Sequence, residues 1–307
     1  MNNTNLTMQN ESIFLVINPL AGGTDKTEQL ELIKNYIENQ GYNFVFYQTT
    51  GNKEEPKDDT EIKKIYKKYT PKKVVIAGGD GTVKFVFETL FEEDVIFGIL
   101  PMGSANGLAK DLDLPNEIEA CLEIALKDNY KNVDSICINK MKSFHLSDLG
   151  LNAELVKNYE HAKARGKIGY ALQAFPTLME FRNPFNARIT TPDTQIVTQA
   201  KVILIANSSK YGTGVIVNPE GKVDDDIFEI VIFRTLELFL ILKILFGNLP
   251  LEDESIEIIR TKKAVIQTDI PISFQIDGEF CGEVRKLDIE MEKHKIKIAT
   301  PEIKLEI

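Results

Sequence analysis

The segment from Val74 to Thr82 constrains the fold of this chain more than any other stretch. It reads Val-Val-Ile-Ala-Gly-Gly-Asp-Gly-Thr, so an apolar run of strand type enters a turn that contains three glycines. Glycines let the backbone approach a ligand closely and turn its N–H groups toward an anion. Asp80 and Thr82 then open a helix, whose positive N-terminal end also favours phosphate. The segment predicts a phosphate-binding turn, although a strand–turn–helix unit with no ligand would share the pattern.

Composition allows two modest domains and argues against several classes of function. The chain has 307 residues, of which 43% are hydrophobic, enough for two cores. Its three cysteines, Cys121, Cys137 and Cys281, follow no metal-ligand spacing, which is typical of reduced thiols in a cytoplasmic protein. A net charge of −10 argues against nucleic-acid binding and against broad adhesion to anionic membranes. No signal peptide or membrane span is evident, so we expect only local, transient contact with a membrane surface.

Strand-like and helix-like segments alternate from residue 12 to about residue 127. Strands are expected at 13–17, 43–48, 73–77 and 95–100, and helices at 27–39, 58–69, 82–91 and 104–126, the last open to a break at Pro115. This alternation is typical of an α/β domain with a doubly wound, Rossmann-like parallel sheet covered by helices on both faces. Ligands of such sheets bind beyond the carboxyl ends of the strands.

The pattern changes after residue 133 to short strand-like runs separated by turn residues. These runs are expected at 133–138, 143–150, 196–206, 227–233, 255–260, 263–268, 272–276 and 285–291. They predict an antiparallel β-sandwich or barrel-like domain. Apolar helices expected at 168–181 and 236–246 could line a channel for acyl chains or simply cover a sheet. The first domain is therefore placed at 11–133, to which the tail 300–307 could return, and the second at 134–299.

Two more glycine-containing loops follow predicted strands of the first domain. Residues 18–22 read Asn-Pro-Leu-Ala-Gly and close the first strand, and residues 103–107 read Gly-Ser-Ala-Asn-Gly and follow the fourth. Ser104 could donate to a phosphate oxygen, and Asn106 could fix the loop or bind nucleotide. Each loop could also be only a capped connection to a helix. If all three loops lie at one edge of the sheet, they form a cradle for phosphate.

In this order and spacing, the three loops resemble those of the diacylglycerol kinase catalytic-domain family, which includes bacterial lipid kinases and the sphingosine kinases. The motifs that carry the resemblance are Asn18-Pro19-x-x-Gly22, Gly78-Gly79-Asp80-Gly81-Thr82, Pro101-x-Gly103-Ser104-x-Asn106, Asn207, Asp224-Asp225 and Asp277-Gly278-Glu279. The middle motif alone is shared with the wider superfamily of NAD kinases and phosphofructokinases. The resemblance implies a nucleotide domain and a lipid-binding domain, with the active site in the cleft between them.

The resemblance also implies roles for individual residues. The implied ATP site consists of Asn18, Pro19, Leu20, Ala21, Gly22, Thr49, Gly78, Gly79, Asp80, Gly81, Thr82, Val83, Lys84, Ser104 and Asn106. Glu279 would be the base that takes the proton of the lipid hydroxyl as its oxygen attacks the γ-phosphate. Asp80 and Asp134 would be further catalytic residues. A Mg²⁺ site would use the side chain of Asp225 and the carbonyl groups of Lys222 and Ile227.

The residue types suit this chemistry, but each motif in the second domain also has a simpler explanation. Phosphoryl transfer needs positioning, charge neutralisation and a carboxylate that accepts the alcohol proton. Residues 277–279 follow an apolar strand, which suits a carboxylate in a pocket, yet Asp-Gly is also common in ordinary β-turns. Residues 224–226 offer the oxygen ligands that Mg²⁺ prefers, and a plain acidic turn would read the same.

Four positions depart from the family pattern. Ser104 and Gly107 stand where most bacterial diacylglycerol kinases carry threonine and aspartate, which puts the usual metal–phosphate network of that loop in doubt. The sphingosine kinases, however, also read Gly-Ser-x-Asn with a small residue next. Lys84 replaces a frequent asparagine and could contact a phosphate or point into solvent. Asp226 replaces the glycine after the metal-binding aspartate, which puts the structural Mg²⁺ in doubt.

We therefore predict a kinase that uses ATP and Mg²⁺ to phosphorylate the hydroxyl of a lipid alcohol such as diacylglycerol. A sphingoid-base kinase is one alternative, which the Gly-Ser-x-Asn loop favours. A non-catalytic lipid- or nucleotide-binding module is another. A soluble-substrate enzyme such as an NAD kinase shares the Gly-Gly-Asp-Gly motif, but the apolar helices count against it. We expect a cytoplasmic protein that meets the membrane surface transiently and binds no nucleic acid, and the sequence leaves a homodimer open.

Overall fold

The structure is a computed structural model that describes residues 11–23, 26–50, 57–150, 183–211, 215–235 and 254–302. The helices predicted at 168–181 and 236–246 lie outside these residues. None of the described helices has the length and apolar composition that crossing a bilayer requires.

The chain divides into two compact units. The first combines the residues up to Asn132 with the C-terminal segment from Ile296, and the second covers 133–295. The return to the first unit begins at Ile296, whereas the sequence placed residues as far as 299 in the second domain. It begins there because Ile296 and Ile298, both buried, belong to a strand of the first sheet.

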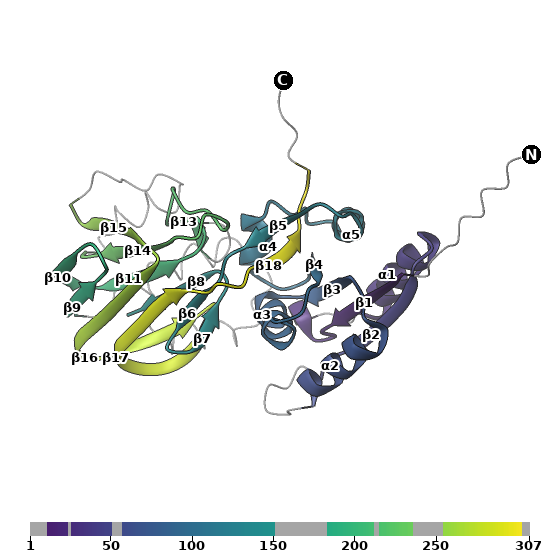
Figure 1. The fold of residues 1–307 in the computed structure, drawn as a ribbon, viewed down its shortest axis with the longest axis horizontal. Coiled ribbons are helices and arrows are strands. Elements are labelled where there is room, and N and C mark those ends of the chain that lie inside the picture. Colours follow the sequence, from purple (N-terminus) through teal and green to yellow (C-terminus); the bar gives the residue numbers. More distant parts are fainter. Residues whose placement is uncertain are drawn as a thin grey trace, which may run out of the picture. The chain divides into compact units, whose positions relative to one another are not determined.

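Six strands form the sheet of the first unit, in the order β2-β1-β3-β4-β18-β5 (Figure 1). Their bounds are β1 Ser12–Ile17, β2 Asn43–Gln48, β3 Lys73–Gly78, β4 Ile96–Pro101, β5 Tyr130–Val133 and β18 Ile296–Ala299. β1 pairs in parallel with β2 and β3, and β4 pairs in parallel with β3 and β18. The predicted doubly wound parallel sheet is confirmed, and a strand from the C-terminal end of the chain extends it.

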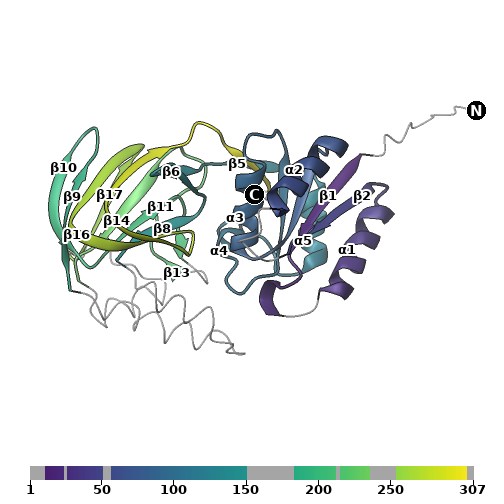
Figure 2. The ribbon, with the colours of Figure 1, turned by 90° about the horizontal axis from the view of Figure 1, so that it is seen from below.

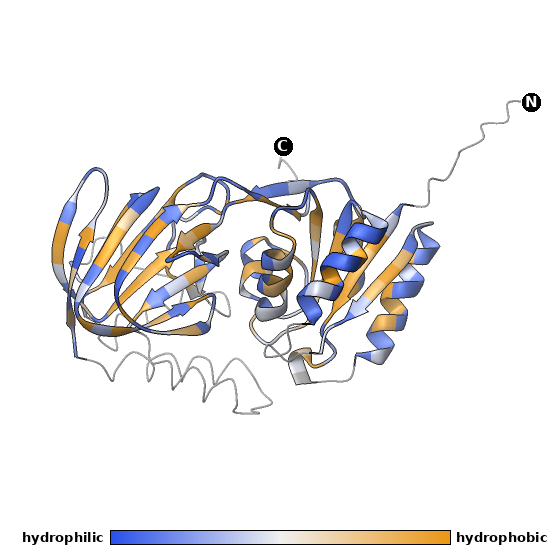
Figure 3. Cartoon of the chain, turned by 60° about the horizontal axis from the view of Figure 1, so that its bottom comes forward, coloured by the Kyte–Doolittle hydropathy of each residue, from blue (hydrophilic) through white to orange (hydrophobic). Residues whose placement is uncertain are grey.

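Helices cover both faces of this sheet (Figure 2). They are α1 Thr27–Asn39, α2 Asp58–Tyr69, α3 Asp80–Thr89, α4 Gly107–Asp111 and α5 Ile118–Leu126, with a short 3-10 turn at Ala21–Gly23. On one face Leu15, Ile37 and Leu122 share the core that α1 and α5 close. On the other face Phe87 of α3 packs against Phe97 of β4, with ring centroids 4.8 Å apart. Burial on both faces explains why the strands are almost continuously hydrophobic (Figure 3).

Two helices of the first unit differ from the prediction. α3 begins at Asp80 and not at Thr82, because Gly79 already serves as its N-cap in an extended conformation (φ −95°, ψ −176°). The helix predicted at 104–126 is divided into α4 and α5, so the break that the sequence allowed around Pro115 is present.

Within the described residues, the second unit is built on a ten-stranded sheet whose neighbouring strands pair antiparallel. Its strands are β6 Ile136–Ile138, β7 Met141–Ser143, β8 Leu146–Leu149, β9 Phe185–Thr190, β10 Gln195–Ala200, β11 Val202–Ala206, β14 Phe228–Phe233, β15 Ile256–Thr261, β16 Lys263–Ile276 and β17 Glu279–Met291, with a separate ribbon of β12 Lys210–Tyr211 and β13 Val215–Ile216. The order is β15-β14-β11-β8-β16-β17-β6-β7, and β9 joins β16 to β10.

The long strand β16 turns this sheet into a sandwich-like fold. Its first half pairs with β9 and its second half with β8, and the register with β17 shifts between Gln267 and Ile272. A strand that bends in this way passes from one layer to the other at a corner. Ile203, Ile266 and Ile289 are at most 1% exposed in the core that the strands share. The prediction of an antiparallel sandwich-type domain is confirmed.

Several strand boundaries differ from those expected. The run predicted at 196–206 forms two strands, β10 and β11, because the chain turns at Lys201, whose N–H donates to the carbonyl of Phe233. The runs predicted at 263–268 and 272–276 form one strand, β16. β9 and β18 were not predicted, although the burial pattern of β9 alternates strictly.

Candidate active site

The three glycine-containing loops lie at one edge of the first sheet. They follow β1, β3 and β4, which are neighbours and run in parallel, so their carboxyl ends meet at the same edge. From β1 the chain continues to β2 on one side, and from β3 it continues to β4 on the other. Such a switch point is where open parallel sheets bind their ligands.

Asn18 joins the first loop to the second. Its side-chain Nδ2 donates to Oγ1 of Thr82 at 3.1 Å, and its Oδ1 accepts the N–H of Leu20 at 2.9 Å. Thr82 lies in the first turn of α3 and is 9% exposed. Both polar atoms of the Asn18 amide therefore hold the loops in place, while Leu20 is exposed and Ala21 is buried.

Glycines allow the three loops to touch one another through their backbones. A Cβ atom on Gly103 would lie 2.4 Å from Cα of Gly79, and a Cβ atom on Gly79 would lie 3.0 Å from Cα of Gly103. A Cβ atom on Gly22, whose φ of 66° suits glycine, would lie 2.7 Å from the carbonyl oxygen of Met102. The loops are therefore interlocked, because a side chain at position 22 or 103 would fit only if the facing backbone moved.

The start of α3 provides backbone donors at the rim of these loops. The N–H groups of Thr82 and Val83 donate to the carbonyl of Gly79 at 2.9 and 3.0 Å. The N–H groups of Asp80 and Gly81 precede these bonds and have no partner within the helix. Asp80 is half-buried and Gly81 is exposed, so a ligand can reach this turn. The geometry suits an anion bound at the helix N-terminus.

In the third loop, the side chain of Asn106 stabilises the backbone. Asn106 has a left-handed conformation (φ 53°), accepts the N–H of Gly103 at 2.8 Å and donates to the carbonyl of Gly103 at 3.0 Å. Of its two expected roles, the structure shows the loop-fixing one. Ser104 is exposed at the tip, whereas Thr49, after β2, is only 5% exposed.

Lys84 and Lys110 both lie in this region, and the sequence pointed only to Lys84. Lys84 on α3 is 8% exposed, so it does not point into solvent. Lys110 on α4 was missed: burial lowers the pKa of its ammonium group, and the negative charge of Asp80 opposes that shift. Lys110 is therefore close enough to Asp80 to add positive charge near the rim. The sequence feature that could have indicated Lys110 is its position one helical turn after the third loop.

In the second unit, Asp277 and Gly278 form a two-residue hairpin turn between β16 and β17. The φ angles of Asp277 and Gly278 are 51° and 83°, as in a type I′ turn. One oxygen of Asp277 accepts from Oγ of Ser143 at 3.0 Å, and the other accepts from the N–H of Phe144 at 3.1 Å. The Asp277 carboxylate thus fixes the hairpin to the turn that precedes β8. Glu279 begins β17 and is half-buried.

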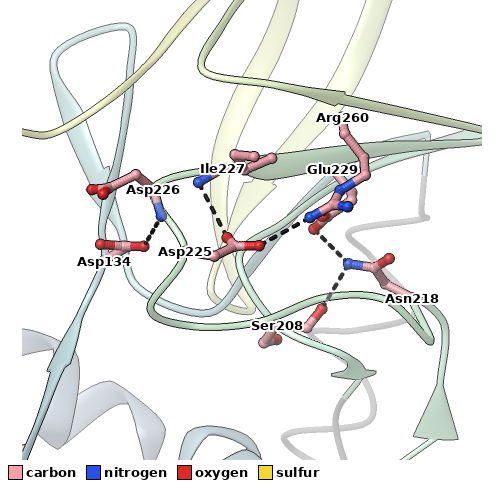
Figure 4. Close-up of polar contacts among 8 residues, drawn as sticks. All are labelled: Asp134, Ser208, Asn218, Asp225, Asp226, Ile227, Glu229 and Arg260. Carbon is pink, nitrogen blue, oxygen red and sulfur yellow. Dashed lines mark hydrogen bonds and ion pairs between the residues drawn. The ribbon is translucent and has the colours of Figure 1, made fainter.

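Asp134 is a buried anchor beside the acidic turn at 224–226 (Figure 4). It is 1% exposed, and its Oδ2 accepts the N–H of Asp226 at 2.6 Å. Its Oδ1 lies 2.9 Å from Nζ of Lys295, which also lies 2.8 Å from Oδ1 of Asp226. The hydrogen bond from Lys295 lowers the pKa of Asp226. Asn207 donates to the carbonyl of Asp134 at 2.8 Å. Both carboxylate oxygens of Asp134 therefore support this turn.

The residues around Asp225 do not fit the implied metal site. Oδ1 of Asp225 accepts the N–H of Ile227 at 3.2 Å, and Oδ2 accepts from Arg260 at 2.9 Å. Burial raises the pKa of the neighbouring Glu229, while its hydrogen bond from Asn218 and the charge of Arg260 act against that rise.

Comparisons with known families agree with this architecture. The family model of the diacylglycerol kinase catalytic domain matches residues 12–138. The model of the YegS C-terminal NAD kinase beta sandwich-like domain matches residues 148–299. The two matches follow one another along the chain and correspond to the parallel sheet and the sandwich. The chain belongs to the diacylglycerol kinase catalytic-domain family.

Similar proteins carry related names. A probable lipid kinase YegS-like protein from Chromohalobacter salexigens is 27% identical over 68% of this chain and 70% of its own length. A diacylglycerol kinase from Staphylococcus saprophyticus is 24% identical over 74% of this chain and 76% of its own. A crystal structure of a diacylglycerol kinase from Bacillus anthracis superposes with a TM-score of 0.70 and 19% identity, covering 95% of this chain and 97% of the other. Another structure from that organism reaches a TM-score of 0.78 at 22% identity, with the same coverage. These structural likenesses show the fold.

Proposed function

We propose that this chain is an ATP-dependent lipid kinase that transfers the γ-phosphate to the hydroxyl of a lipid alcohol such as diacylglycerol. The observation that supports the proposal most is the interlocked cradle in which Asn18 bonds to Thr82 and Gly79 touches Gly103. A cradle of this kind, with helix N–H donors at its rim, suits a polyphosphate. The names of similar proteins supply the class of acceptor.

In this proposal the first unit binds the nucleotide. The backbone N–H groups of Asp80 and Gly81 contact phosphate oxygens, and Ser104 donates to them from the third loop. Lys84 and Lys110 supply positive charge that stabilises the transferring phosphoryl group. A divalent cation bound together with ATP would neutralise further charge, and Asp80 is the carboxylate at the rim that would help to hold it.

The second unit contributes the proton acceptor. The hydroxyl oxygen of the lipid forms a bond to the γ-phosphorus while the bond from that phosphorus to the bridging oxygen of ADP breaks. The hydroxyl proton moves to the carboxylate of Glu279. The Asp277 bonds keep the hairpin that carries Glu279 in place. Asp134 acts as a positioning residue for the turn at 224–226.

The acceptor is proposed to be membrane-borne, so turnover brings the protein to a bilayer surface. A sphingoid base is the second candidate acceptor, because Gly103-Ser104-x-Asn106 is also the form of this loop in the sphingosine kinases. Presenting the two lipid classes in separate vesicles distinguishes the two candidates.

The test is transfer of labelled γ-phosphate from ATP to vesicles that contain diacylglycerol, a sphingoid base or neither. We expect Glu279→Gln and Asp80→Asn to lose transfer. The matched controls are Glu283→Gln, exposed on the same strand as Glu279, and Glu88→Gln, exposed on the same helix as Asp80. Full activity in either site variant removes the assigned mechanism. Nucleotide binding by the wild type with no transfer to any lipid would favour a non-catalytic module instead.

A further inference from the structure

Arg260 bridges two carboxylates of the second unit (Figure 4). It lies on β15 directly opposite Glu229 of β14 in the strand register. Its Nη2 donates to Oδ2 of Asp225 at 2.9 Å, and its Nε donates to Oε1 of Glu229 at 3.2 Å. Glu229 is fully buried and also accepts from Nδ2 of Asn218 at 2.7 Å. A planar guanidinium with several fixed donors is suited to hold two carboxylates at once.

Lys295 does the same for the neighbouring pair of carboxylates. Its Nζ lies 2.9 Å from Oδ1 of Asp134 and 2.8 Å from Oδ1 of Asp226. Asp226 has a left-handed backbone (φ 61°), a conformation that favours glycine. An aspartate at this position gives Lys295 its second partner. The departure from the family's glycine is therefore part of an ion-pair arrangement.

Each carboxylate of this arrangement has a basic side chain of the protein as its partner. Asp225 and Glu229 share Arg260, and Asp134 and Asp226 share Lys295. A divalent cation at Asp225 would have to displace the guanidinium, or lie beside it and be repelled by its charge. The remaining oxygen of Asp225 already accepts a backbone N–H.

We infer that Arg260 and Lys295 take the place of a structural divalent cation, so the acidic turn at 224–226 is held by internal ion pairs and binds no Mg²⁺. The inference concerns the second unit alone and does not depend on the proposed reaction. It also separates two uses of Mg²⁺, because the ion that accompanies ATP in catalysis is not involved here.

The test measures the thermal unfolding midpoint of the full chain without nucleotide or lipid, in EDTA and in millimolar MgCl2. The quantity of interest is the Mg²⁺-induced rise in midpoint of the wild type compared with that of Asp225→Asn. We expect the two rises to be equal. A bound ion at a hundred times its Kd would make the rise in the wild type about 5–10 °C larger than the rise in Asp225→Asn. Such a difference would overturn the inference.

Arg260→Gln tests directly whether Arg260 stabilises the two carboxylates that it bridges. In EDTA it should lower the midpoint, because a fully buried carboxylate loses its cationic partner. Lys286→Gln is the control, because Lys286 pairs with Asp288 at an exposed site of the same unit. A midpoint of Arg260→Gln equal to that of Lys286→Gln would refute the bridging role. If Arg260→Gln does not fold, the comparison of the wild type with Asp225→Asn still decides the question.

Discussion

The contact between Gly79 and Gly103 makes a quantitative prediction for the phosphate-binding loops. In Gly103→Ala the new Cβ would lie 2.4 Å from Cα of Gly79, a backbone atom that cannot rotate away. Gly79→Ala is milder, because its Cβ would lie 3.0 Å from Cα of Gly103. Overpacking of this kind costs about 1–3 kcal/mol, so we expect the midpoint to fall by about 3–10 °C for Gly103→Ala and by less for Gly79→Ala.

The same substitutions should weaken ATP binding, because separating the loops moves the N–H donors at the start of α3. Calorimetric titration with ATP and thermal unfolding give the two readouts. Gly41→Ala is the control: its Cβ would meet no atom within 4 Å, although its φ of 84° carries a backbone cost of about 1–2 kcal/mol. It should therefore lose stability and keep its ATP affinity. If Gly103→Ala is as stable as the wild type and binds ATP equally well, the interlocked arrangement is refuted.

Three further predictions address pH dependence, the hairpin and the rim. Burial, followed by the hydrogen bond to Asp58, raises the pKa of Tyr47 from 10.0 to about 12, so the stability it contributes is complete below pH 10 and is lost as the pH rises toward 12. Between pH 10 and 12, the free energy of unfolding should fall less in Tyr47→Phe than in the wild type, by up to about 2–3 kcal/mol. An equal fall in both proteins would contradict the raised pKa of Tyr47. Asp277→Ala leaves a hydroxyl and backbone N–H groups without their acceptor and should cost about 2–4 kcal/mol in urea unfolding; a loss no larger than that of an exposed Asp→Ala change would show otherwise. Lys110→Gln removes positive charge beside Asp80 and should weaken ATP binding about tenfold with little change in midpoint, whereas unchanged affinity would limit Lys110 to packing.

The local sequence pattern was sufficient to predict the bounds of elements that depend mainly on their own residues. The helices at 27–39 and 58–69 and the strand at 43–48 were predicted with their observed bounds. β18 could not be predicted in this way, because it is a strand only through pairing with β4, about two hundred positions earlier in the chain. The joining of two predicted runs into β16 also depends on partners, since β9 supports its first half and β8 its second.

For the candidate site, the sequence indicated that the three loops could share one edge of the sheet, because each follows a strand of a predicted parallel sheet. It could not assign the amides within those loops. Asn18 bonds to Thr82, which lies 64 positions away, and the choice of Asn106 between fixing the loop and binding nucleotide depends on the exact path of the backbone. Lys110 was overlooked for a similar reason: its proximity to Asp80, 30 positions earlier, exists only in the folded domain.

The aspartates of the second unit show why a carboxylate in a motif is not by itself a catalytic group. Asp134 supports a turn with both oxygens, and Asp225 is paired with Arg260. Asp277 binds a hydroxyl and backbone N–H groups. A carboxylate fully occupied by fixed donors must give up those bonds before it can accept a proton from a substrate, and giving them up costs free energy. Catalysis is therefore better served when such aspartates hold the backbone rigid and a separate residue, for which we propose Glu279, changes its protonation state during turnover.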